Sequence, residues 1–418
     1  WACCMARRDP SRKREVNKDP QENLTATAEP ALEVRYDSRV EGRDKPPEAT
    51  LIIPVFNVAD YVEQCLASVF ATAATVDLEI IIIDDGSQDA SGNIVHAVLT
   101  QMKPAQTLYL KQANQGLSAV RNRGVSLATG EYVGFLDSDD MLTAGAMRIL
   151  LDFAGNHRCD LVLGKSQVFD SKSHEVYPFY DDWAWRRLLD AAATRVVSKH
   201  EDPALFFLEP NANYRLIRRD LFSRFDFTYP VGRLFEDPPV HYKMLASAAR
   251  VGLVDVPYYW YRVNRPGKIT AERSLRRFDI LEVARETFIE LGQSDVTPEA
   301  GGAIVYGLSR IVWWCGSMTL PEHRHEFFQQ ACRIFADHAP TPWIARFGAC
   351  RFPAEIQHLV VGSLVRNEAN RLERLSYGRR SPLHSFLFLL KIGRKDLILR
   401  RIREMSAKLL ARFWFIKS

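Results

Sequence analysis

The segment LEIIIIDDGSQDAS, residues 78–91, places a run of four isoleucines directly before two aspartates, a glycine and a serine. A continuous β-branched run of this kind is typical of a strand that is buried on both faces, as in a parallel sheet. Asp89 or Ser91 is placed to cap a helix that continues through Val95 and Leu99. The segment therefore predicts a strand, an acidic turn and a helix.

A second unit of the same kind lies upstream. The apolar run TLIIPVFN, residues 50–57, predicts a strand, and the helical spacing that follows it is formed by Tyr61, Val62, Cys65, Leu66 and Val69. Strand, helix, strand and helix in short succession predict a doubly wound α/β domain, with a mostly parallel sheet flanked by helices.

A third predicted strand, in GEYVGFLDSDD at residues 130–140, ends on Asp137, Asp139 and Asp140. Three carboxylates at one strand end repel one another unless a cation binds between them. Mg²⁺ or Mn²⁺ takes few protein oxygens and leaves coordination positions for phosphate, so we expect a divalent cation that carries a nucleotide diphosphate. A solvated acidic turn is the alternative, because aspartate favours turns through local hydrogen bonds.

Three polar residues each follow one of these predicted strands, namely Asn57, Asp85 and Asp137. In open α/β sheets, ligands bind in a crevice at the carboxyl ends of the strands. We therefore expect the three side chains to lie around one crevice.

The chain resembles the inverting family 2 nucleotide-sugar glycosyltransferases of bacterial surface-polysaccharide type. The segments that carry the resemblance are, in order, IIPVFN (52–57), IDDGSQD (83–89), NQGLSAVRNRG (114–124), ATGEYVGFLDSDD (128–140) and FEDPPV (235–240). They fall within about residues 48–265, a little over half of the chain. The resemblance implies a GT-A fold, which is Rossmann-like, and the apolar spacing after residue 270 predicts a mainly α-helical C-terminal region.

The resemblance implies roles for the residues that meet the donor. Asp85 hydrogen-bonds the base, and a carboxylate accepts well from an imide N–H. Asp137 holds the ribose and metal region, and Asp139 ligates the Mg²⁺ or Mn²⁺ that bridges the phosphates. Arg121 contacts the diphosphate or base, with an exposed helical cation as the alternative, although many members have alanine where this chain has Val120. The other donor-binding positions of the motifs are Pro54, Asn57, Asn114 and Gly116.

Glu236 and Asp237 resemble the acidic pair that acts on the acceptor. By resemblance Asp237 takes the proton of the acceptor hydroxyl as that hydroxyl attacks the anomeric carbon, which inverts the configuration. Pro238 and Pro239 fit the first turn of a helix, so Asp237 lies where the helix dipole favours a carboxylate. An N-cap aspartate without a chemical role is the alternative.

The segment PYYWYRVNRPGKIT, residues 257–270, follows a short predicted strand at 251–256. We expect a loop whose basic side chains Arg262, Arg265 and Lys268 fold over the diphosphate. Binding of an anionic acceptor and a plain basic surface loop are the alternatives.

Composition limits the rest of the chain. With 418 residues and 47% hydrophobic content, the chain can hold a large domain and a smaller one, which we place at 48–270 and 271–376. Residues 1–47 are polar and predict a disordered arm without an apolar signal-peptide core. The chain begins at Trp1 instead of methionine, so its true N-terminus is undefined. Seven cysteines without metal-ligand spacing indicate reduced thiols in a cytosolic compartment.

Amphipathic helices are expected after residue 270, with Trp313 and Trp314 in their core in preference to stacking on a sugar. Residues 371–418 contain thirteen Lys or Arg and three acidic residues, a net charge of +10. Within them an apolar stripe flanked by basic residues is formed by Ile398, Ile402, Met405, Leu409 and Phe413. Residues 377–418 therefore predict a basic amphipathic tail on an anionic membrane surface, with a helix docked on the catalytic domain as the alternative. No nucleic-acid recognition motif accompanies the charge.

Taken together, the sequence predicts a metal-dependent inverting glycosyltransferase at the inner face of the cell membrane. The donor is expected to be a nucleotide-diphosphate sugar, most simply a UDP-sugar, and the acceptor a glycan or lipid-linked molecule in cell-surface polysaccharide synthesis. A catalytically silent GT-A scaffold and a sugar nucleotidyltransferase are the alternatives, and the second lacks a Gly-rich, lysine-containing phosphate loop.

Overall fold

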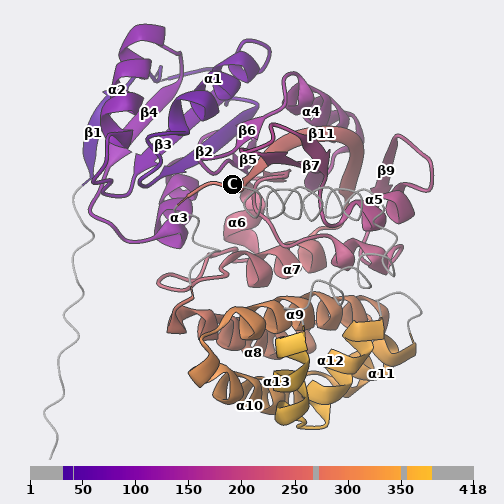
Figure 1. Ribbon diagram of the computed structural model, residues 1–418. Coiled ribbons are helices and arrows are strands. Elements are labelled where there is room, and N and C mark those ends of the chain that lie inside the picture. The colour runs from indigo at the N-terminus through magenta and orange to yellow at the C-terminus, as the bar shows by residue number, and fades with distance from the viewer. Residues whose placement is uncertain (1–31, 41, 267–272, 350–354, 379–418) are drawn as a thin grey trace, which may run out of the picture. The chain divides into compact units, whose positions relative to one another are not determined.

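Strand β3, the predicted strand at Leu78–Asp84, is the third strand from one end of a mixed sheet (Figure 1). The structure is a computed structural model and describes residues 32–40, 42–266, 273–349 and 355–378. The strand order is β1-β4-β3-β2-β5-β10-β7-β11-β6, and β8 and β9 pair with β7 and β11. The strands are β1 (Glu33–Asp37), β2 (Ala49–Val55), β3 (Leu78–Asp84), β4 (Thr107–Lys111), β5 (Tyr132–Phe135), β6 (Met141–Leu142), β7 (Leu161–Asp170), β8 (Val176–Pro178), β9 (Thr194–Val197), β10 (Arg215–Arg218) and β11 (Val251–Val263).

The strands β4, β3, β2 and β5 are parallel neighbours, as the sequence predicts. All residues of β2 and β3 are buried, which confirms that these strands are covered on both faces. In the register between them, Ile53 pairs with Ile82. Because the strands are parallel, the residues that follow them (Asn57, Asp85, Gln112 and Asp137) come to the same edge of the sheet.

Helices flank the sheet and then form a region of their own (Figure 1). The α-helices are α1 (Val62–Ala73), α2 (Ser91–Met102), α3 (Leu117–Leu127), α4 (Ala146–His157), α5 (Asp182–Leu189), α6 (Asp220–Arg224), α7 (Asp237–Ser247), α8 (Asp279–Gly292), α9 (Pro298–Met318), α10 (Pro321–His338), α11 (Thr341–Ala349), α12 (Glu355–Val365) and α13 (Ala369–Gly378). The described residues also form the 3₁₀ helices η1 (Pro203–Phe207) and η3 (Leu275–Phe278). Helix α3 packs closely on β2 because Gly124 has no side chain, and a Cβ there would collide with Ile52.

Two sequence predictions are wrong in part. The disordered arm predicted for residues 1–47 includes β1, which pairs antiparallel with β4, with Glu33 opposite Lys111. This pairing satisfies backbone groups at the edge of the sheet, which the polar composition of the arm does not reveal. Residues 1–31, with Cys3 and Cys4, lie outside the described residues.

The second correction concerns the aromatic segment after residue 256. It is not a loop, because β11 continues to Val263 and pairs in parallel with β7, with Arg262 opposite Phe169. Its aromatic side chains are buried at Tyr258 and Tyr259, and this burial stabilises the long strand. Lys268 lies outside the described residues.

From residue 275 onward the described elements are all helical. Trp313 is 2% exposed, which confirms it as a core residue, and the half-buried Trp314 packs beneath the guanidinium of Arg277 at 4.7 Å. Helix α9 packs on η1, and Arg310 of α9 forms an ion pair with Glu209. The basic tail predicted for 377–418 lies outside the described residues after Gly378. Within the described part of the chain, no helix combines the length and the apolar character needed to cross a bilayer.

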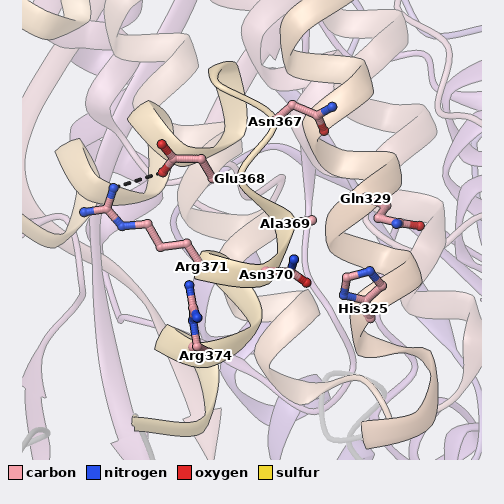
Figure 2. A pocket seen from close by; sticks show the side chains of 8 residues that line it. All are labelled: His325, Gln329, Asn367, Glu368, Ala369, Asn370, Arg371 and Arg374. Atoms are coloured by element: carbon pink, nitrogen blue, oxygen red, sulfur yellow. Dashed lines mark hydrogen bonds and ion pairs between the residues drawn. The ribbon is translucent and has the colours of Figure 1, made fainter.

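A hollow of about 470 Å³ opens between α10 and α13 (Figure 2). Its lining is polar and consists of His325, Gln329, Asn367, Glu368, Ala369, Asn370, Arg371 and Arg374. Arg371 is already paired with Glu368 at 2.9 Å. None of the residues that the sequence predicts as site residues lines this hollow.

Candidate active site

Asp85, directly after β3, organises the loop that leads into α3. Its buried carboxylate accepts hydrogen bonds from the Gln112 side chain at 2.8 Å and from the backbone N–H groups of Gln115 at 2.9 Å and Gly116 at 2.7 Å. Gly116 has a φ of +87°, a conformation that favours glycine. Asp85 therefore holds residues 112–116 in one conformation and fixes where α3 begins.

The end of β2 is tied to the same turn. The N–H of Asn57 donates to Ser87 Oγ at 3.1 Å, and the side-chain oxygen of Asn57 accepts from the N–H of Gln88 at 2.9 Å. Phe56, just before Asn57, is 43% exposed. Of the other predicted donor-binding residues, Pro54 is buried within β2 and Asn114 is exposed beside the turn.

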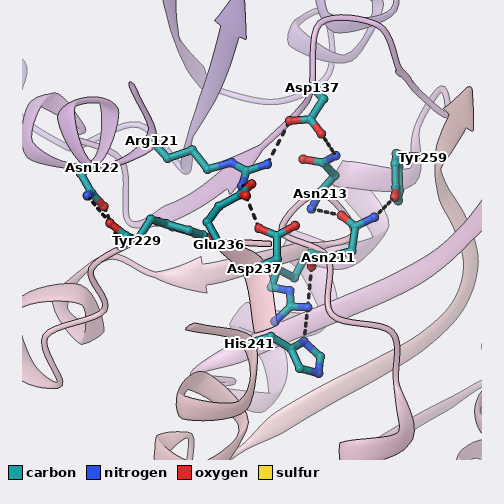
Figure 3. Close-up of polar contacts among 11 residues, drawn as sticks. Arg121, Asn122, Asp137, Asn211, Asn213, Tyr229, Glu236, Asp237, His241 and Tyr259 are labelled. Carbon is teal, nitrogen blue, oxygen red and sulfur yellow. Dashed lines mark hydrogen bonds and ion pairs between the residues drawn. The ribbon is translucent and has the colours of Figure 1, made fainter. Parts of the chain in front are cut away.

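Asp137 follows β5 and contacts two side chains that come from distant parts of the sequence (Figure 3). One carboxylate oxygen accepts from Arg121 Nη2 at 3.0 Å, and the other accepts from Asn213 Nδ2 at 3.0 Å. The Asp137 side chain remains 30% exposed. It is therefore held in place and is still accessible to a ligand.

Arg121, on α3, is the centre of the charge cluster. Its Nη1 lies 2.7 Å from Glu236 Oε1 and 2.7 Å from Asp237 Oδ1, in addition to its contact with Asp137 (Figure 3). The guanidinium stacks 5.2 Å from the ring centroid of Tyr229, and the side chain is 1% exposed. The alternative of an exposed helical cation is therefore wrong for Arg121.

Glu236 and Asp237 lie at the start of α7, where Pro238 and Pro239 occupy the first turn as predicted. Their side chains are 12% and 22% exposed. Burial raises the pKa of Glu236 to about 7, and the neighbouring Asp237 charge adds to this effect while Arg121 opposes it. Burial also raises the pKa of Asp237, again against the charge of Arg121. The pair can therefore bind or release a proton near neutral pH.

Behind this pair lies a second buried cation, Arg215 of β10. Its Nη2 donates to the carbonyl oxygen of Asn211 at 2.6 Å and lies 2.7 Å from Nδ1 of His241, one helical turn after Asp237. Burial and the charge of Arg215 lower the pKa of His241, so that the ring is neutral.

Sequence reasoning missed Asn213 and Arg215, together with Asn211. The only sign of these residues in the sequence is the polar run EPNANYR at 209–215, which lies between apolar segments. Strand β10, which begins at the end of this run, is short and antiparallel to both of its neighbours. No periodicity or spacing distinguishes such a segment from an ordinary loop.

Comparison with known proteins agrees with this geometry. Residues 50–212 match the family described as Glycosyl transferase family 2. These residues form a family 2 glycosyltransferase domain. The crystal structure of S. aureus TarS 1–349 in complex with UDP-GlcNAc is similar to this structure, with a TM-score of 0.63. The similar region covers 80% of this chain and 91% of the TarS chain, at 18% sequence identity. It establishes the GT-A fold.

Curated relatives resemble about half of the chain. The uncharacterized glycosyltransferase EpsJ of Bacillus subtilis is 31% identical over 227 residues, which are 54% of this chain and 63% of EpsJ. The glycosyltransferase GlyA of Streptococcus pneumoniae is 29% identical over 52% of this chain and 30% of its own length. The poly(ribitol-phosphate) beta-glucosyltransferase of Bacillus spizizenii is 26% identical over 52% of this chain and 33% of its own length. The chain thus spans less than two thirds of the length of each of these relatives.

Two arginines flank the acidic end of β5 in the family 2 domain. Arg262 is buried, and its Nε donates to the backbone oxygen of Asp139 at 2.6 Å while Nη2 donates to Gln64 at 2.7 Å. Arg265 forms an ion pair with the Asp139 carboxylate and stacks 5.3 Å from the ring centroid of Tyr61. Contact of either arginine with an anionic ligand stays a prediction.

The acidic end of β5 fits a divalent cation that brings its own phosphate ligands. The described residues contain no group of three or more His, Cys, Asp or Glu side chains gathered as a complete metal cage. Mg²⁺ usually binds through one or two carboxylates, waters and substrate phosphates, so a complete cage is not needed. Arg265 engages one oxygen of Asp139, and the other has no hydrogen-bond partner among the described residues. Asp139 and the partly exposed Asp137 are therefore the residues that would hold such a cation.

Proposed function

We propose that this chain transfers a sugar from a nucleotide-diphosphate donor to a hydroxyl group of an acceptor, with inversion at the anomeric carbon. The observation that carries the proposal is the contact network in which Arg121 joins Asp137, at the end of β5, to Asp237, at the start of α7. This network sets a candidate base opposite the strand ends where ligands of α/β sheets bind.

The donor is proposed to lie along the ends of β2, β3 and β5. Asp85 and the 112–116 loop would contact the base, with Asn57, Asn114 and Gly116 beside it. Phe56 offers an exposed aromatic ring on which a base can stack. A UDP-sugar is proposed because TarS, which has the same fold, was solved with UDP-GlcNAc.

The chemistry assigned to the chain is a single displacement. The acceptor oxygen forms a bond to the anomeric carbon, the bond from that carbon to the nucleoside diphosphate breaks, and the acceptor proton passes to Asp237. Because the pKa of Asp237 is raised by burial, the carboxylate is a better base than an exposed aspartate would be. Asp139 and Asp137 would hold Mg²⁺ or Mn²⁺, which when bound neutralises charge on the departing diphosphate.

The acceptor is proposed to be a glycan or lipid-linked molecule of a cell-surface polysaccharide. Relatives named for such roles include the minor teichoic acid biosynthesis protein GgaB of Bacillus subtilis, at 25% identity. We propose that the enzyme works at the cytoplasmic face of the membrane, held there by the basic tail. Liposome flotation of a chain ending at Ser376 should show lost binding to anionic vesicles, and unchanged flotation would remove this part of the proposal.

A nucleotide-release screen tests the function. UDP-, GDP- and CDP-sugars are offered with Mg²⁺ or Mn²⁺ to the wild type, to Asp139→Ala and to Asp152→Asn, an exposed carboxylate on α4 that serves as the control. We expect release with one class of donor, loss of release in Asp139→Ala, and wild-type release in Asp152→Asn. Failure of every donor would favour a catalytically silent scaffold.

A further inference from the structure

The side chain of Arg121 has no donor group turned to open solvent. Nη1 is shared between Glu236 and Asp237, Nη2 contacts Asp137, and the residue is 1% exposed. The rings of Tyr229 and Phe135 cover the guanidinium, at 5.2 and 5.9 Å from their centroids. The remaining donor, Nε, has no hydrogen-bond partner among the described residues but is buried, so a phosphate could reach Arg121 only by displacing groups that now surround it. The geometry therefore speaks against the direct diphosphate or base contact that the sequence predicts.

The three carboxylates come from two separate elements. Asp137 follows β5 on the donor side, whereas Glu236 and Asp237 begin α7. The planar guanidinium can hold both sides at once because its N–H groups point in fixed, different directions. A lysine ammonium carries the same charge at a single point and cannot reproduce this fork. Arg121 is thus the buried cation that links the β5 end to the α7 start.

We infer that Arg121 is a positioning residue, which orients Asp237 toward the acceptor by tethering it and Glu236 to Asp137. The inference rests on the proposed function, since it assigns Asp237 as the base. Arg121 acts through these carboxylates and does not itself touch the substrate. Its second effect is electrostatic, because its charge favours the ionised form of Asp237, the form that can accept a proton.

Other groups also face Asp237 and set the background for this effect. Arg215 acts in the same direction as Arg121, and Asp137 acts in the opposite direction. The remaining titratable neighbours are Glu236, Tyr214 and Tyr229. Removing Arg121 leaves Asp237 beside two other carboxylates, with Arg215 as the remaining cation. We therefore expect Asp237 to hold its proton to a higher pH when Arg121 is absent.

The test compares Arg121→Gln, which removes the charge, with Arg121→Lys, which keeps the charge and removes the fork. The kcat of nucleotide release and the Kd for UDP are measured between pH 5 and 9. In Arg121→Gln the acidic limb of the kcat profile should move up by about 1–3 pH units, the effect of losing a close opposite charge. In Arg121→Lys the acidic limb should move less than in Arg121→Gln, while kcat should fall below the wild-type value. The Kd for UDP should change less than kcat in both variants.

A buried arginine outside the site provides the control. Arg324 of α10 is buried and donates to the backbone oxygens of Ser317 and Thr319, so Arg324→Lys disturbs packing without touching the carboxylates. It should lower the melting temperature and leave the pH profile unchanged. An Arg121→Gln variant with an unchanged profile and a tenfold weaker Kd for UDP would overturn the inference and assign Arg121 to phosphate.

Two further measurements apply if Arg121→Gln does not fold. Asp137→Asn removes a carboxylate that raises the pKa of Asp237, so the residual activity should show its acidic limb at lower pH. Carbon-13 NMR of the Asp237 carboxyl group, assigned with Asp237→Asn, follows its titration in Arg121→Lys without any turnover. An Asp237 titration identical to wild type in Arg121→Lys, with full activity, would contradict the inference. Failure of wild type to release nucleotide would instead contradict the proposed function.

Discussion

The Asp139 carboxylate forms an ion pair with Arg265, the last arginine before the segment 267–272. The Arg265 side chain is 10% exposed and packs on Tyr61, so the pair is largely shielded from solvent. Because Asp139 is also the proposed cation ligand, Arg265 and a divalent cation would compete for the same carboxylate.

This competition predicts opposite effects of two substitutions. Arg265→Ala should bind Mn²⁺ more tightly than wild type in the absence of nucleotide, since one competing positive charge is gone. Asp139→Ala should lose Mn²⁺ binding and keep its melting temperature within a few degrees. Electron paramagnetic resonance of free Mn²⁺ measures both affinities, and equal Mn²⁺ affinity in all three proteins would contradict the proposed cation site.

Asp85 should control the loop that begins α3. In Asp85→Asn one of the two acceptor oxygens becomes a donor, so the N–H of Gly116 or the pair of donors from Gln112 and Gln115 loses its partner. We expect faster hydrogen exchange at residues 112–116 and a Kd for UDP at least about tenfold higher, because hydrogen bonds to charged groups contribute about 1.5–3 kcal/mol. Asp152→Asn is the matched control. Unchanged exchange at 112–116 would argue against this role of Asp85.

Phe56 is predicted to contribute to nucleotide affinity and little to stability. It is 43% exposed, so Phe56→Ala leaves no large cavity. Stacking of a base on an aromatic side chain is worth about 1–3 kcal/mol, and we expect the Kd for UDP to rise about tenfold or more. Tyr180→Ala, which removes another exposed aromatic ring at 48% exposure, should leave the Kd unchanged. Titration calorimetry measures both values of the Kd for UDP. If the two substitutions changed this Kd equally, a specific stack at Phe56 would be ruled out.

Asp181 predicts a pH dependence of stability. Its pKa is raised to about 7 by burial, from an ordinary value of 3.8, although an N–H from Glu209 partly opposes this. Between pH 4 and pH 7 the folded state therefore binds a proton that the unfolded state has released, and the free energy of unfolding falls as pH rises through this range. In Asp181→Asn this contribution is absent, so the melting temperature should fall less between pH 5 and pH 8. If the melting temperatures of wild type and variant changed by the same amount between pH 5 and pH 8, the assignment would be contradicted.

The sequence predicted the elements that local chemistry specifies. The runs before Asn57, Asp85 and Asp137 are rich in β-branched or aromatic residues and end on polar turns, so strands β2, β3 and β5 and their shared edge could be located without a structure. The start of α7 followed from Pro238 and Pro239 in the same way.

What the sequence could not predict depends on contacts between distant segments. Arg121 looks like a surface residue of a polar helix, and its burial follows from Tyr229 and the start of α7, more than 100 positions away. Asn213 and Arg215 lie in a short segment whose role appears only when β10 inserts between β5 and β7. The extension of β11 to Val263 likewise depends on its partner β7.

The most direct test of the central claim is nucleotide release by Asp237→Asn, measured together with the Kd for UDP. We expect the variant to bind UDP as wild type does and to release nucleotide from its donor at least about 100-fold more slowly, because a positioned base contributes about 10²–10⁴-fold. Wild-type release by a correctly folded Asp237→Asn protein would contradict the account.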